Sequence, residues 1–151
     1  MGDILLMFVE RSPNYFILGL AAFLIAHICY VLLFFRERNP ELKPYGLLLG
    51  LTLYAVLFFF VVKDGLGELF LAVLLYMIVI LMMLTAAFLR TKMVKPLSYR
   101  LVFIGAVSFV ISDSILALNK FFKPWDFAGL FIMLTYALAQ YFIVIGLLKK
   151  R

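Results

Sequence analysis

The sequence predicts an all-α fold, a polytopic transmembrane helix bundle with about five spanning helices and an N-terminal half-helix. Hydrophobic residues make up 67% of the 151 residues, and the mean hydropathy is +1.15. A soluble fold of this length needs a larger polar exterior. The apolar residues form runs close to the ~20 residues that cross a bilayer, and basic residues gather between the runs. We predict a single integral membrane domain over residues 1–151.

The first apolar segment, Met1–Val9, is too short to cross a bilayer and is typical of the second half of a helix. A loop is predicted at Glu10–Asn14, where Ser12 and Pro13 have the residue types of an N-cap and a first helical position. The first spanning helix is predicted over Tyr15–Phe35 and ends before the charged segment Arg36–Pro40. Charge and proline together stop a helix at this point.

Four further spanning helices follow, separated by short polar segments. They are predicted over Tyr45–Val62, Gly67–Leu89, Ser98–Leu118 and Phe127–Leu148. Lys63-Asp64-Gly65 is predicted to form a tight turn. Trp125 is expected to anchor a loop at the membrane interface, since aromatic rings with a polar tip favour that depth.

The basic residues divide unequally between the two ends of this bundle. One end is predicted to carry four of them: Arg11, Lys63, Lys120 and Lys123. The other carries ten: Arg36, Arg38, Lys43, Arg90, Lys92, Lys95, Arg100, Lys149, Lys150 and Arg151. The positive-inside rule predicts that the second end is cytoplasmic, and with it the C-terminus. We expect a multi-pass integral membrane protein, in the inner membrane if the cell is bacterial.

The composition also excludes several classes of function. The net charge of +6 does not indicate a nucleic-acid partner, because the basic residues lie where they set membrane topology. The chain has one cysteine, Cys29, so it cannot form an intramolecular disulfide. One cysteine and one histidine are too few for a His/Cys-rich metal site, and we predict no metal.

One carboxylate, Asp113, lies inside an apolar run. An ionisable group within a membrane helix costs roughly 2.5 kcal/mol or more, and it is a functional-site hypothesis by default. We expect Asp113 to face other helices rather than lipid. Gly105, Ser108 and Ser112 recur at helical spacing beside it, forming a stripe of small residues that lets a neighbouring helix come close.

Three segments resemble the YhhN-like lysoplasmalogenase family of integral membrane hydrolases. They are Gly2–Met7 (GDILLM), Phe16–Tyr30 (FILGLAAFLIAHICY) and Gly105–Ala117 (GAVSFVISDSILA), and they occur in the family's order and spacing. Members of that family have more spanning helices than we count here. We therefore expect this chain to lack N-terminal helices relative to the family.

The resemblance implies hydrolysis of the vinyl ether bond of a lysoplasmalogen, giving a fatty aldehyde and glycerophospho-ethanolamine or -choline. It implies no cofactor. The reaction begins with proton transfer to an alkene carbon, so it needs one carboxylic acid that keeps its proton and one carboxylate that stabilises a cation or activates water. Burial favours the neutral form of a carboxyl. Asp113 and Asp3 are the candidate catalytic residues, in either order of roles.

Depth in the bilayer is compatible with this pair. Asp113 lies roughly 9 Å from its predicted helix end, and Asp3 lies about as far from its own. His27 lies roughly 18 Å from that side, and it is expected to bind the headgroup, order water or hold Tyr30. The candidate substrate-binding residues are His27, Tyr30, Ser112, Tyr136 and Gln140. For each of them, and for both aspartates, the other interpretation is interhelical packing or hydrogen bonding.

Two other functions fit the same residues. A small transporter or proton-coupled membrane protein also places Asp and His within the membrane, although the helices carry few polar residues and no broken helix pair. A non-catalytic truncated member of the family is the other. The expected partners are a lysophospholipid substrate and the lipid bilayer. A homodimer could complete a chamber that one chain forms only in part.

Overall fold

A computed structural model describes residues 13–149, with side chains from residue 16 onward. Its elements are α2 (Pro13–Phe35), α3 (Tyr45–Leu66), the 3₁₀-helix η1 (Gly67–Leu69), α4 (Phe70–Leu89), α5 (Pro96–Phe121) and α6 (Ala128–Leu148). Every element in this part of the chain is helical, which confirms the all-α prediction. The predicted half-helix Met1–Val9, with Asp3, lies outside the described residues.

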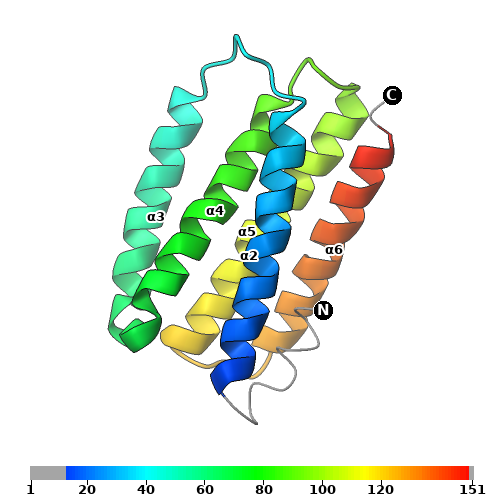
Figure 1. Cartoon of the computed structure of the whole chain (residues 1–151). Helices are drawn as coiled ribbons and strands as arrows, with labels where there is room; N and C mark the ends of the chain where they lie inside the picture. Colours follow the sequence, from blue (N-terminus) through cyan, green and yellow to red (C-terminus); the bar gives the residue numbers. More distant parts are fainter. Residues whose placement is uncertain (1–12, 150–151) are drawn as a thin grey trace.

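The described helices are long and apolar enough to cross a membrane. Four continuous stretches qualify: Phe16–Phe35, Tyr45–Leu89, Pro96–Phe121 and Ala128–Leu148. The second is 45 residues long and contains α3, η1 and α4. Helices α3 and α4 run in opposite directions and are joined by η1 (Figure 1). A helical rise of about 1.5 Å per residue gives each α-helix roughly 30 Å or more, which is the thickness of a bilayer's hydrocarbon core.

The reversal between α3 and α4 corrects one predicted turn. Lys63-Asp64-Gly65 belongs to the last turns of α3, and the chain reverses at Gly67, whose φ is +49°. Glycine reaches this conformation without the Cβ clash that other residues meet. Gly65 serves a different purpose, because a Cβ there would lie 1.9 Å from the carbonyl oxygen of Phe121. Helix α4 therefore begins at Phe70 rather than at Gly67.

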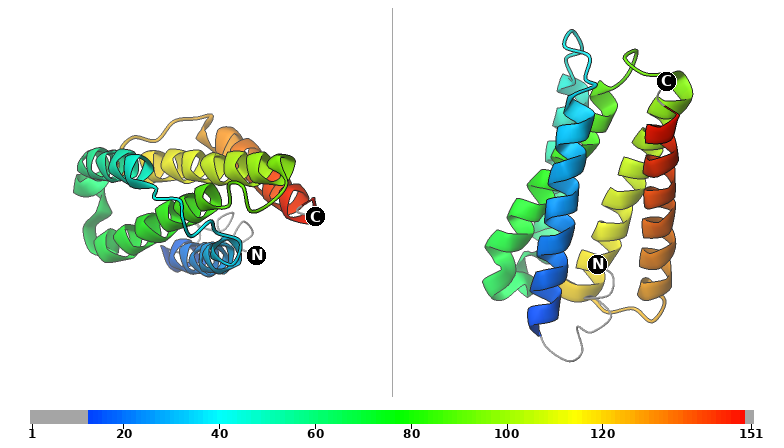
Figure 2. Two further views of the ribbon diagram at one scale, coloured as in Figure 1. Left: turned by 90° about the horizontal axis from the view of Figure 1, so that it is seen from above. Right: turned by 45° about the vertical axis from the view of Figure 1, so that its right-hand side comes forward.

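Helix α5 lies at the centre of the packing. It packs most extensively against α6 and also contacts α3 and α4, while α2 packs against α4 (Figures 1 and 2). The core between these helices contains fully buried side chains from four of them: Phe34, Met83, Ala86, Ala87, Val102, Ala106, Phe109 and Ile143. Helix α3 lies at the edge and contributes little to this core.

Two glycines let α5 and α6 approach closely. A Cβ on Gly105 would lie 2.9 Å from the Ala139 carbonyl oxygen, and one on Gly146 would lie 3.0 Å from the Val102 nitrogen. Gly105, the first residue of the predicted small-residue stripe on α5, is therefore in contact with α6. Ser112 extends the same face, since its hydroxyl donates a hydrogen bond to the Ile132 carbonyl at 3.1 Å.

The charged loops lie at the two ends of the bundle as predicted. The ends of α2, α4 and α6 and the starts of α3 and α5 share one end, shown at the top of Figure 1. The basic residues in or beside the loops of this end are Arg36, Arg38, Lys43, Arg90, Lys92, Lys95 and Lys149. Lys63, Lys120 and Lys123 lie at the opposite end. That the more basic end is cytoplasmic stays a prediction.

A buried ion pair ties this basic end together. Arg90, which is 0% exposed, donates from Nε and Nη2 to Oε2 of Glu37 at 2.9 and 2.6 Å. Ser98 lies 3.4 Å from Nη2 and donates its own hydroxyl to the Gly146 carbonyl at 2.6 Å. The cluster of Arg90, Glu37 and Ser98 therefore connects the α2–α3 loop, the end of α4, the start of α5 and α6.

Replacing Gly105 with alanine is expected to destabilise the protein by about 1–3 kcal/mol, because the added methyl overpacks the α5–α6 contact. Thermal unfolding in detergent micelles measures the change. Gly129→Ala is the matched control on α6, because no atom lies within 4 Å of a Cβ at that position. An unchanged unfolding midpoint for Gly105→Ala would show that α6 can shift without cost.

Replacing Glu37 with glutamine is expected to lower the free energy of unfolding by about 3 kcal/mol, since it leaves a buried guanidinium without its counter-charge. Denaturation with an ionic detergent measures this. Asp64→Asn is the control, because the Lys63–Asp64 pair is exposed and its charges are 3.9 Å apart. The double variant Glu37→Met with Arg90→Met should recover stability. If it does not, the charges themselves are not the source of the loss.

Candidate functional site

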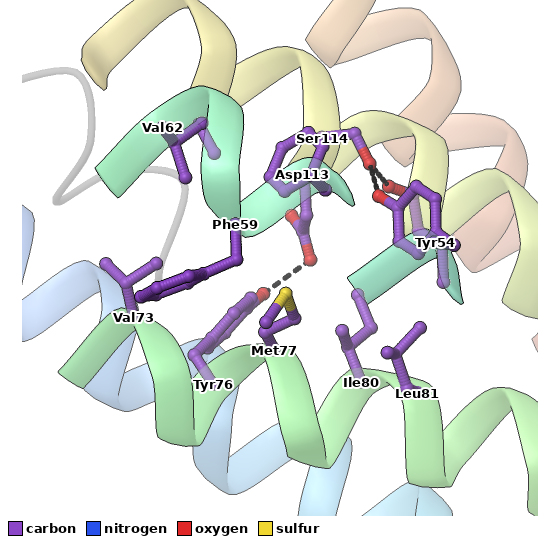
Figure 3. A pocket seen from close by; sticks show the side chains of 13 residues that line it. Tyr54, Phe59, Val62, Val73, Tyr76, Met77, Ile80, Leu81, Asp113 and Ser114 are labelled. Carbon is purple, nitrogen blue, oxygen red and sulfur yellow. Dashed lines mark hydrogen bonds between the residues drawn. The ribbon is translucent and has the colours of Figure 1, made fainter. Parts of the chain in front are cut away.

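Asp113 lines a small cavity between α3, α4 and α5. Its Oδ2 accepts a hydrogen bond of 2.6 Å from the hydroxyl of Tyr76, which comes from α4 and is 8% exposed (Figure 3). The cavity has a volume of about 50 Å³, enough for a few water molecules. Apolar side chains such as Phe59, Met77 and Ile80 line the rest of it. Asp113 thus faces other helices, as predicted.

A second tyrosine reaches the same cavity from α3 but bonds to a different partner. The Tyr54 and Ser114 hydroxyl oxygens are 2.6 Å apart. Because the Ser114 hydroxyl donates to the Val110 carbonyl, Tyr54 is the donor in its bond with Ser114. Two tyrosine hydroxyls therefore face one cavity, and only Tyr76 is bonded to the carboxyl group.

His27 lies behind Tyr76 and is 1% exposed. Its ring meets the Tyr76 ring edge-on, with centroids 5.5 Å apart, and the Phe109 ring at 5.0 Å. Nδ1 lies 2.8 Å from the Phe23 carbonyl, which can only accept, so Nδ1 carries a proton. Nε2 has no hydrogen-bond partner among the described residues. His27 thus packs against Tyr76, and Tyr76 in turn is hydrogen-bonded to Asp113.

Three other predicted substrate-binding residues form a separate cluster between α2 and α6. The Tyr30 hydroxyl donates to Oε1 of Gln140 at 2.9 Å, and Nε2 of Gln140 donates to the Tyr136 hydroxyl at 3.1 Å. None of the three lines the cavity at Asp113. The Phe109 ring lies between His27 and Tyr136, with its centroid 5.0 Å from that of His27 and 5.4 Å from that of Tyr136. Tyr136 also interacts electrostatically with Tyr76, the partner of Asp113, so the cluster borders the Asp113 site through this residue.

The remaining two predicted site residues are Ser112 and Asp3. The buried Ser112 side chain bonds to the backbone of α6, on the face of α5 that packs against that helix. Asp3 lies outside the described residues. Their roles in binding and catalysis stay predictions.

Three residues at the cavity were not predicted from the sequence: Tyr54, Tyr76 and Ser114. Tyr76 is the one tyrosine in α4, and a tyrosine hydroxyl in the middle of an apolar helix must find a partner when it is buried. That signal points to a polar contact but not to its identity. The contact spans 37 residues of sequence, and only the packing of α4 on α5 selects it.

Together, the apolar helices, the loops with charged residues at both ends and the carboxyl in the interior define a multi-pass integral membrane protein. The sequence model of the YhhN family matches residues 1–147. The chain therefore belongs to the YhhN family, which confirms the resemblance seen in its three motifs. No curated protein and no solved structure matches the sequence.

Proposed function

We propose that this protein hydrolyses the vinyl ether bond of a lysoplasmalogen, with Asp113 as the residue that transfers the proton. The observation that carries this proposal is the position of Asp113, whose carboxyl meets a water-sized cavity inside an apolar helix bundle. A lipid substrate is available at this depth, and the reaction consumes only water. Membership of the YhhN family supports the same conclusion.

The proposed reaction begins when the protonated carboxyl of Asp113 gives its proton to the alkene carbon that lies away from the ether oxygen. The ether-bearing carbon becomes an oxocarbenium ion, which the carboxylate stabilises. Water in the cavity adds to that carbon and returns a proton to the carboxylate. The hemiacetal then breaks its bond to the glycerol oxygen, which takes the hydroxyl proton. The products are a fatty aldehyde and a glycerophosphodiester.

Tyr76 is the proposed positioning residue for this carboxyl. Its hydroxyl donates to Oδ2 and so fixes the carboxyl, and we assign the proton exchange with substrate or water to the other oxygen, Oδ1. A fixed carboxyl orientation matters because proton transfer to carbon requires close alignment of donor and acceptor. His27 packs on the Tyr76 ring and limits its movement. Asp3 remains the proposed second carboxyl, on the strength of its motif.

Replacing Asp113 with asparagine is expected to lower aldehyde release by at least about 100-fold, because the amide cannot act as the acid. The assay uses purified protein, a lysoplasmalogen and detection of the fatty aldehyde. Asp126→Asn, in the exposed loop before α6, is the matched control. Full aldehyde release by Asp113→Asn would remove Asp113 from the mechanism. Substrate-dependent proton flux in liposomes without aldehyde release would favour a transporter.

Replacing Tyr76 with phenylalanine is expected to lower kcat by roughly tenfold while KM changes little, because the carboxyl loses its orientation but the substrate keeps its contacts. Steady-state kinetics separate the two constants. Tyr54→Phe provides the comparison, since it removes a hydroxyl from the same cavity that is bonded to Ser114 instead. Equal losses of kcat in both variants would indicate a general effect on the cavity and not positioning of Asp113.

A further inference from the structure

A second, larger hollow lies between α3 and α4, in the half of the bundle nearer the basic end. It is an apolar groove of about 300 Å³. Its walls include Leu51 and Ala55 from α3, Leu81 and Met82 from α4, and Phe35 from the end of α2. Helices α3 and α4 are joined through η1 at the other end and separate toward the basic end, as Figure 1 shows.

The groove adjoins the cavity at Asp113. Leu81 lines both, so a single side chain marks the boundary between them. Tyr76, at the cavity, and Thr85, in the groove, are nine residues apart on α4, which corresponds to about 14 Å along the helix. A ligand that reaches Asp113 can therefore continue past Leu81 along the α3–α4 groove.

The groove has the chemistry of a hydrocarbon site. Eight of its ten lining side chains are hydrocarbon or thioether groups, and the other two are Thr52 and Thr85. The Thr85 hydroxyl donates to the Leu81 carbonyl at 2.9 Å, so it is already bonded within its own helix. The described walls present no charged group to a phosphate or an amine. An unbranched alkyl chain fits these walls, whereas a polar headgroup does not.

Charge lies on the other side of Asp113. Lys120 and Lys123 follow on the same helix and its loop, at the end where α5 stops at Phe121. Asp113 is eight residues before Phe121, about 12 Å along the axis. Asp64, Glu68 and Asp126 lie at the same end, so the bundle presents an apolar groove, then a carboxyl group, then an end that carries both cationic and anionic residues. A lysoplasmalogen has the same order, with its alkyl chain, its vinyl ether and its zwitterionic phosphodiester headgroup.

We propose that the α3–α4 groove binds the alkenyl chain of the substrate and that Ala55 and Leu81 set the chain length accepted. This inference rests on the proposed function, and it adds the direction in which the lipid lies. The chain runs from Asp113 past Leu81 toward the basic end, and the phosphate lies toward Lys120 and Lys123. Because bilayer hydrocarbon is as apolar as the groove, chain length is selected by the space in the groove and not by hydrophobic transfer.

The first test is the chain-length profile of Ala55→Phe, whose larger side chain fills part of the groove. The rate of aldehyde release with a long (about 18-carbon) chain relative to a short (about 10-carbon) chain should fall roughly tenfold or more. Both rates are measured in each variant, so that a general loss of activity, which lowers them equally, is separated from selection against the long chain. Ala137→Phe makes the same change at an exposed position of α6 and should keep the original ratio. An unchanged ratio in Ala55→Phe would overturn the proposal.

A second test does not depend on activity. A lysophospholipid with a saturated ether chain, which cannot be hydrolysed by this route, carries a photoreactive diazirine at the chain end. After illumination, mass spectrometry should locate adducts within residues 48–56 and 78–85, and Ala55→Phe should reduce them. Adducts spread evenly over the exposed faces of all helices would identify ordinary contact with bulk lipid and overturn the groove. Adducts in the groove, combined with no aldehyde release in the separate lysoplasmalogen assay, would support the chain site and reject the hydrolase.

Discussion

The structure depends on a carboxyl group that the apolar interior must accommodate. Hydrocarbon offers no hydrogen bonds, so a carboxyl inside a membrane helix must find its partner on a neighbouring helix. Tyr76 provides it, at 2.6 Å across the α4–α5 contact. That one bond requires the register of α4 against α5 to be correct. It also couples the chemistry at Asp113 to the packing of the core beneath it.

Close backbone contact between α5 and α6 and a buried ion pair at the basic end fix the helices around this bond. Gly105 and Gly146 bring α5 and α6 together, as expected where helices associate by van der Waals packing. At the basic end, Arg90 joins Glu37 and Ser98, so the α2–α3 loop, the end of α4, the start of α5 and α6 share one fixed point. Helix α3 stands outside that cluster. This leaves α3 free to diverge from α4, and the apolar groove opens between them.

Polar groups inside the bundle divide into two sets with different surroundings. Tyr30, Gln140 and Tyr136 bond mainly to one another between α2 and α6, which is how buried polar side chains join membrane helices. Asp113 and Tyr76 instead meet a cavity with room for water. His27 touches the Tyr76 ring and, through Phe109, lies near the first set. The two sets are also linked, because Tyr136 interacts electrostatically with Tyr76. The cavity is the feature that distinguishes the surroundings of Asp113.

The sequence by itself determined the elements whose causes are local. Helix lengths, the sharing of basic loops at one end and the presence of a carboxyl in an apolar run follow from bilayer thickness and the cost of burying charge. Tertiary structure alone decided which polar groups meet. Gly65 and Gly67 look alike in sequence, but Gly65 packs against the Phe121 backbone, whereas the chain reverses at Gly67. Likewise, only the packing of α4 on α5 places Tyr76 against Asp113, because hydrogen bonds between helices depend on register and distance rather than on neighbours in the chain.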